Sequence, residues 1–176
     1  MNAIRKLRVL SALRGGPSAV NANTQALATS FKTQLLLGGH QLGAITLVSR
    51  GSLTAPTKDS VKAALYVTTA TIGAATTAYS ATNEVTGTGY TAGGVAVTNG
   101  TDPTSSGTTA FWTPSASIVY TTVTLTTAFD CVLLYNSTQN NTAISAHTFG
   151  AQTITAGTFT LTMPTNDSTN ALIRIA

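Results

Sequence analysis

Charged residues are scarce in this sequence. Asp, Glu, Lys and Arg make up 8% of its 176 residues, whereas they make up about 25% of a typical soluble globular protein. Acid–base catalysis depends on ionisable side chains, so this scarcity argues against enzyme activity. A folded protein with so few surface charges is also poorly protected from association. We therefore expect partner molecules to cover much of the surface.

The sequence also has only one cysteine and two histidines. Because Cys131 is alone, it excludes an internal disulfide, and its place in an apolar run predicts a small core residue. His40 and His147 lie far apart in the sequence, and neither has the closely spaced further ligands that mark a metal site. No G-x-S-x-G nucleophile motif occurs. The sequence thus predicts no enzyme, no metal site and no cofactor.

Long hydrophobic runs are missing as well. No stretch approaches the ~18 apolar residues that a membrane-spanning helix needs. Residues 1–13 combine positive charge with apolar residues, but polar residues interrupt the apolar runs too often for a secretory signal. We expect neither a membrane location nor a signal peptide.

The positive charge is concentrated at the N-terminus. The chain has nine basic and five acidic residues, a net charge of +4. Four of the basic residues precede residue 15, where there is no acid, and the rest of the chain is electrically balanced. We therefore divide the chain into an N-terminal arm, residues 1–22, and a single domain, residues 23–176. The candidate partner-docking residues of the arm are Arg5, Lys6, Arg8 and Arg14.

The arm has two interpretations. Its apolar residues recur at nearly helical spacing between the basic ones, which predicts an amphipathic helix that packs on a neighbouring protein. The basic residues could instead bind packaged nucleic acid, but four cations give only weak, salt-sensitive binding. The arm also has no aromatic residue to stack on bases. Protein docking is therefore favoured over nucleic acid. The apolar positions are Ile4, Leu7, Leu10 or Ala12, and Leu13.

A helix is predicted over about residues 24–37. Leu27, Phe31 and Leu35 recur every four residues and would form one apolar face. Gly38 follows as a residue suited to the left-handed conformation that ends many helices.

From about residue 43 the hydrophobic period becomes two, which is typical of strands. In residues 117–126 we expect Val119, Val123 and Leu125 to share one side of a strand, with Ile118 and Tyr120 on the other. Glycine, proline, asparagine, aspartate or serine separates successive candidates. The expected strands are 44–48, 61–68, 94–98, 109–113, 117–126, 130–136, 142–149, 151–155, 157–163 and 171–175.

This pattern predicts a mainly β fold. Many short strands at close spacing indicate a β-sandwich, for which a jelly-roll-like arrangement is one option. One or two N-terminal helices would pack on its base or edge. The segments 80–94 and 99–108, rich in glycine, serine and threonine, are expected to be loops.

Residues 64–94 form a strand, a Thr/Ala/Gly-rich run and a turn-rich stretch, with a single acid, Glu84. The most specific part is Asn83-Glu84-Val85 followed by Gly87, Gly89-Tyr90 and Gly93-Gly94. These residues resemble a family of small, β-rich virion proteins of tailed bacteriophages. Residues 1–22 have no counterpart in that family. The flanking matches are Phe31-Lys32, Gln34 to Gly38, His40, Asp59, Lys62, Ala64 to Tyr66, Leu134 to Ser137, Phe149-Gly150, Phe159 to Leu161, Pro164 and Ala171 to Arg174.

The resemblance implies a non-enzymatic structural protein that is located in the virion after assembly in the host cytoplasm. Its most specific form would be a capsid decoration (cement) protein that stabilises the head by bridging capsomers. The implied partners are the major capsid protein or other virion proteins. A homo-oligomer is expected, with a trimer favoured.

Two alternatives stay open. The protein could belong to the tail, the baseplate or a head fibre, which copy number per particle would reveal. It could also be a carbohydrate- or receptor-binding module, because exposed loops of β-sandwiches often bind sugars. The candidate aromatic residues for stacking on a sugar, or for anchoring an interface, are Phe111, Trp112, Tyr79 and Tyr90.

Overall fold

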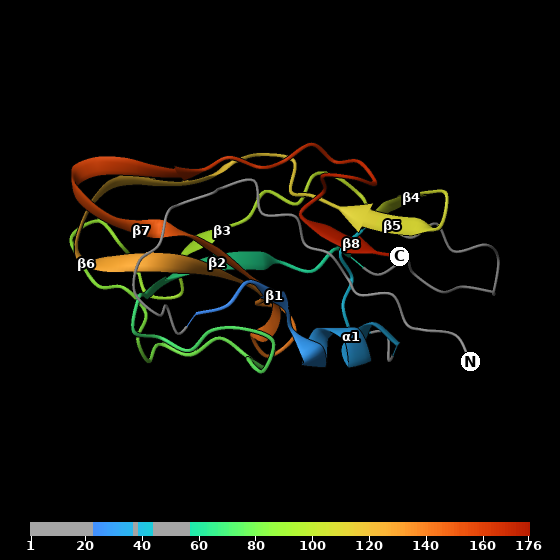
Figure 1. Cartoon of the computed structure of the whole chain (residues 1–176), viewed down its shortest axis with the longest axis horizontal. Coiled ribbons are helices and arrows are strands. Elements are labelled where there is room, and N and C mark those ends of the chain that lie inside the picture. Colours follow the sequence, from blue (N-terminus) through green and yellow to red (C-terminus); the bar gives the residue numbers. More distant parts are fainter. Residues whose placement is uncertain (1–22, 37–38, 44–56) are drawn as a thin grey trace.

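The computed structural model describes residues 23–36, 39–43 and 57–176. The fold is mainly β, with two antiparallel sheets consistent with a β-sandwich, which confirms the predicted class (Figure 1). The larger sheet has the order β1-β7-β6-β2-β3 and the smaller one β4-β5-β8. The elements are β1 (Ala26–Leu27), α1 (Thr29–Leu36), β2 (Val61–Val67), β3 (Val95–Ala96), β4 (Thr104–Ser106), β5 (Thr109–Trp112), β6 (Ile118–Asn136), β7 (Thr142–Leu161) and β8 (Ile173–Ile175).

One long hairpin dominates the architecture. β6 and β7 pair antiparallel from Asn136↔Thr142 beside the turn to Ile118↔Leu161 at the far end. The sequence predicts five short strands over this region, and the structure corrects this to two long ones. The residues that resemble turns are irregularities within continuous strands. The register shifts repeatedly between Tyr120 and Tyr135, and Thr122 and Ala156 adopt positive φ angles.

These irregularities bend the hairpin back over itself, as Figure 1 shows at the left. Bulges bend a strand and increase its twist. The bend brings Phe159 against Phe129 (ring centroids 5.0 Å apart) and Phe149 (5.3 Å), although Phe159 pairs with Tyr120 in the strand register. The two ends of this hairpin, both part of the larger sheet, therefore face each other as two layers.

The bend also changes which side chains face the core. Val119 is 39% exposed, whereas Ile118 and Tyr120 are buried. After the register shift at Thr122, Val123 and Leu125 are buried as well. The expectation that Val119 shares a side with Val123 and Leu125 is therefore wrong. An extra residue in one strand reverses the alternation from that point onward.

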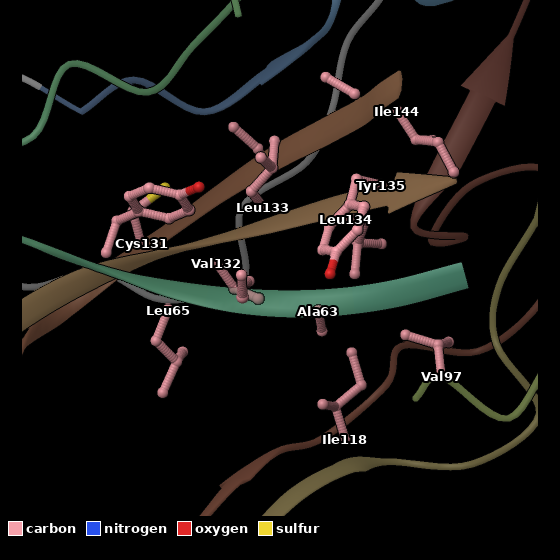
Figure 2. Packing of buried hydrophobic residues seen from close by; sticks show 14 of the residues in the cluster. Ala63, Leu65, Val97, Ile118, Cys131, Val132, Leu133, Leu134, Tyr135 and Ile144 are labelled. Carbon is pink, nitrogen blue, oxygen red and sulfur yellow. The ribbon is translucent and has the colours of Figure 1, made fainter. Parts of the chain in front are cut away.

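The central strands are buried on both faces. In β2, consecutive residues from Ala63 to Tyr66 are all inaccessible to solvent, which is typical of strands covered from two sides. In Figure 2, Leu65 and Ile118 lie on one side of β2, and Cys131 and Leu133 lie on the other. Cys131 is a free, buried core residue, as predicted.

The helix is shorter than the prediction. α1 begins at Thr29 rather than near residue 24, because Ala26 and Leu27 extend and pair with β7 through Ala26↔Ala146 and Leu27↔Ser145. The edge of β7 offers these residues backbone hydrogen bonds that a first helical turn lacks. Leu27 and Phe31 are both buried. The apolar spacing therefore identified core residues correctly, although Leu27 lies in β1 and only Phe31 lies in the helix. None of the helices within the described ranges is long and apolar enough to cross a membrane.

The smaller sheet is built from three short strands, of which only β8 is near the C-terminus. β5 and β8 match the predicted strands 109–113 and 171–175, with somewhat shorter bounds. β4 lies inside 99–108, which the sequence predicts as a loop, and it pairs with β5 across Gly107. The expected strand 44–48 and the arm residues Arg5, Lys6, Arg8 and Arg14 lie outside the described residues.

Candidate functional site

Glu84 lies in the loop between β2 and β3, at the centre of a buried polar cluster. Its side chain is buried, with 7% exposure. Tyr79 donates a hydrogen bond to Oε2 (2.7 Å), and Tyr90 donates one to Oε1 (2.7 Å). The backbone N–H of Gly93 also donates to Oε1 (2.8 Å). A carboxylate with three donors is well satisfied, so this cluster fixes the loop rather than leaving a reactive group.

Further tyrosines surround this carboxylate. The ring of Tyr79 stacks on Tyr135 at 4.8 Å, and the ring of Tyr90 stacks on Tyr120 at 5.9 Å. Burial, followed by the hydrogen bond to Glu84, raises the pKa of Tyr79 and of Tyr90 well above the ordinary value. Burial is also the main cause that raises the pKa of Tyr120. These phenols stay protonated near neutral pH and act as hydrogen-bond donors, not as bases.

The structure divides the four aromatic candidates between two places. Tyr79 and Tyr90 meet at Glu84, whereas Phe111 and Trp112 lie in β5. Trp112 is 1% exposed, and its indole N–H donates to the Thr101 carbonyl (2.9 Å) and to Asn99 Oδ1 (3.2 Å). A buried indole with both partners inside the protein cannot stack on a sugar.

Phe111 is 8% exposed and borders a small groove. This groove has a volume of about 330 Å³ and lies between α1, residues 40–43 and the smaller sheet. Its lining is mainly apolar: Phe31, Leu35, His40, Gln41, Leu42, Gly43, Pro103, Ala110, Phe111, Trp112, Ile173 and Ile175.

His40 belongs to a network that ties the helix to the sheet. Asn136 Nδ2 donates to His40 Nδ1 (3.0 Å) and to the buried Asp59 carboxylate (2.6 Å). His40 Nε2 lies 2.7 Å from Gln34 Oε1. This arrangement requires a neutral imidazole with its proton on Nε2, and burial lowers the pKa of His40 despite the attraction of Asp59. The network positions α1 and presents no free nucleophile.

His147 lies elsewhere, in β7. Its Nε2 is 2.9 Å from Ser145 Oγ, and burial lowers its pKa to about 4. Within the described ranges, no group of three or more His, Cys, Asp or Glu side chains is placed to hold a metal ion. His40 and Asp59 thus share one network, whereas His147 lies apart from it.

A second, larger groove opens where the two layers of the bent hairpin face each other. We call it the sheet-edge groove. Its volume is about 510 Å³. Among the residues that the structure describes, no Asp, Glu, Lys or Arg lines it. The lining residues are Gln25, Ile118, Val132, Leu134, His147, Thr148, Phe149, Thr160, Leu161, Thr162, Met163, Pro164 and Leu172.

The outer half of the hairpin, defined as residues 118–127 of β6 and 150–161 of β7, is an uncharged surface. It contains no acidic or basic residue. Exposed threonines dominate it, with the partly exposed Val119 beside them. The exposed threonines are Thr121, Thr122, Thr126, Thr127, Thr153, Thr155, Thr158 and Thr160.

Comparisons with known proteins give no relative. No family model matches the sequence, and neither a curated protein nor a solved structure matches the chain significantly.

Proposed function

We propose that this protein is a non-enzymatic structural component of a tailed-bacteriophage virion, and that it decorates the capsid. The observation that carries the proposal is the exposed, uncharged outer half of the hairpin. Charged residues are depleted at the centres of protein interfaces because they are costly to desolvate. A wide surface of threonine hydroxyl and methyl groups avoids that cost and can bond to the backbone or side chains of a shell protein. The motif resemblance to small virion proteins supports the same role.

The proposed mechanism is the bridging of capsomers through several modest contacts. A homo-oligomer, with a trimer favoured, would present one outer half per copy to the major capsid protein or to another virion protein. Linking contacts in this way raises the overall affinity without any single strong one. The shell would then resist the pressure of the packaged DNA. In this proposal the protein is not an enzyme, and its location is the virion.

An electron-microscopy map of the virion tests the location. Many copies spread over the head support decoration, whereas a few copies at the tail, baseplate or a fibre would replace it with the alternative structural role. Heads that lack the protein should lose resistance to heat. Heads that keep normal resistance would exclude the cementing mechanism.

Matched surface variants test the contact. Thr153→Lys combined with Thr155→Lys places charge on the outer half, and we expect this variant to fold but not to bind heads. Thr69→Lys combined with Thr71→Lys changes two exposed threonines in the loop after β2 and should leave binding intact. Equal binding by both variants would show that the outer half is not the contact surface.

A further inference from the structure

The sheet-edge groove is a large apolar opening in the core. Its volume of about 510 Å³ is many times the ~30 Å³ that one water molecule occupies in the liquid. Leu161, Met163 and Leu172 are only partly buried where they line it. Water gains few hydrogen bonds against such a surface, so an apolar occupant is favoured over solvent.

The first described residues of the chain lie beside this groove. Gln25, three residues after the arm, is part of the lining. Asn23 is buried and fixed, since its Nδ2 donates to Asp130 Oδ1 (2.7 Å) and to the Val67 carbonyl (3.0 Å). β1 runs antiparallel to β7 through Ala26↔Ala146. Chain that precedes β1 is therefore directed towards the part of β7 that borders the groove.

We propose that the N-terminal arm, residues 1–22, packs its apolar residues into the sheet-edge groove of its own chain. The apolar residues of the arm recur at nearly helical spacing, and the described lining residues include no Asp, Glu, Lys or Arg that would oppose them. In a helix, Arg5 and Arg8 would lie on the side opposite Leu7 and Leu10 and would remain in solvent.

The length of the arm suits this placement. A helix over residues 4–13 would be about 15 Å long. Residues 14–22 can span about 30 Å when extended, and Gly15-Gly16-Pro17 within them separates any helix from β1. Because Asn23, the first described residue, is fixed near Gln25 in the lining, the arm of the same chain would be present at a high effective concentration, which favours it over the arm of a second copy.

Filling of the groove by the arm does not depend on a role in a virion. Its consequence is a basic patch held at a fixed place next to the uncharged outer half of the hairpin. An acidic partner surface would then meet positive charge and the neutral threonine surface together.

Oxidation of Met163 tests the proposal in the full-length protein. Hydrogen peroxide converts an accessible methionine thioether to the sulfoxide, and mass spectrometry of the peptide that contains Met163 gives the rate. We expect Met163 to react much more slowly than free methionine. Leu7→Asp combined with Leu10→Asp should expose the groove and raise the rate several-fold. Leu7→Ala combined with Leu10→Ala is a milder version that keeps helix propensity, and it should raise the rate less.

The matched control removes charge and keeps the apolar residues. Arg5→Ser combined with Arg8→Ser should leave Met163 protected. Equal oxidation rates in all four proteins, with native circular dichroism, would overturn the proposal. Protection that disappears on dilution would overturn the assignment to the same chain, because packing within one chain does not depend on concentration. The far-ultraviolet circular dichroism of each variant identifies any loss of the fold. If the Asp variant does not fold, the oxidation rate of Met163 in the Ala variant decides whether the arm protects the groove.

Discussion

Tyr90 connects Glu84 to the central strand β2. Its hydroxyl donates to Glu84 Oε1 (2.7 Å) and accepts a hydrogen bond from the backbone N–H of Leu65 (3.0 Å). The loop that carries Glu84 also pairs with β2 through Tyr66↔Glu84. One phenol thus links a buried carboxylate to the backbone of the core, and the loop is fixed from two directions.

Glu84→Gln should therefore destabilise the fold. The amide keeps one acceptor oxygen but loses the charge, and hydrogen bonds to a charged group each contribute about 1.5–3 kcal/mol. We expect the free energy of unfolding in urea to fall by about 2 kcal/mol. Thr82→Ala, a change at an exposed residue of the same loop, should alter it by less than about 0.5 kcal/mol. An unchanged midpoint for Glu84→Gln would show that the cluster does not stabilise the loop.

Because several tyrosines are buried, we expect the protein to unfold cooperatively at alkaline pH. Burial raises the pKa of Tyr66 and Tyr120 above the unfolded value of about 10. A group whose pKa is higher in the folded state stabilises the fold below the unfolded pKa, and this contribution is lost as the pH rises. Above pH ~10, each such tyrosine should lower stability by about 1.4 kcal/mol per pH unit. Tyrosinate absorbance and circular dichroism should therefore change together. Ionisation of all the tyrosines near pH 10 in a protein that remains folded would contradict this expectation.

His147 predicts a loss of stability in acid. Burial lowers its pKa from the ordinary 6.5 to about 4, so the folded state favours the neutral imidazole. The stabilisation of the folded state by the neutral His147 is complete above pH ~6.5 and is lost as the pH falls towards 4. The full effect is about 3 kcal/mol. Carboxylates titrate in the same range, so the measurement is the difference in urea stability between the wild type and His147→Gln. A difference that does not change with pH would show that His147 is equally solvated in both states.

Gly94 should not tolerate a side chain. It has a φ of +68°, and a Cβ there would overlap the Ala63 carbonyl in β2. Gly107 has a similar φ of +57° but open space around it. Gly107→Ala should therefore cost only the ~1 kcal/mol of an unfavourable backbone conformation, whereas Gly94→Ala should abolish folding or shift the melting temperature far more. Similar melting temperatures for the two variants would mean that backbone conformation alone determines the cost.

Local patterns predicted much of the fold. β2, β3, β5 and β8 lie where alternation and turn residues place them, and Cys131 lies in the core. The hairpin was predicted as fragments, because a residue such as Gly150 signals a turn in the sequence but lies within β7 here. The difference depends on long-range pairing, which local composition does not encode.

The Glu84 cluster and the sheet-edge groove were harder to predict. The only sign of the cluster was a lone acid flanked by Tyr79 and Tyr90 in a segment otherwise rich in threonine, alanine and glycine. Neither helical nor strand periodicity brings those three side chains together, because they lie in irregular loops. The groove depends on how far the hairpin bends, and that follows from bulges that no single residue type announces.

The bent hairpin has a mechanical consequence. In a sandwich whose layers are joined only by loops, one proteolytic cut in a loop can allow the layers to separate. Here β6 and β7 pass through both layers as two paired strands, so two covalently continuous segments join the layers in addition to the contacts of the core. A cut in the exposed segment between β3 and β4 would leave the two layers connected. A protein built in this way can lose a loop and still transmit tension between its two layers.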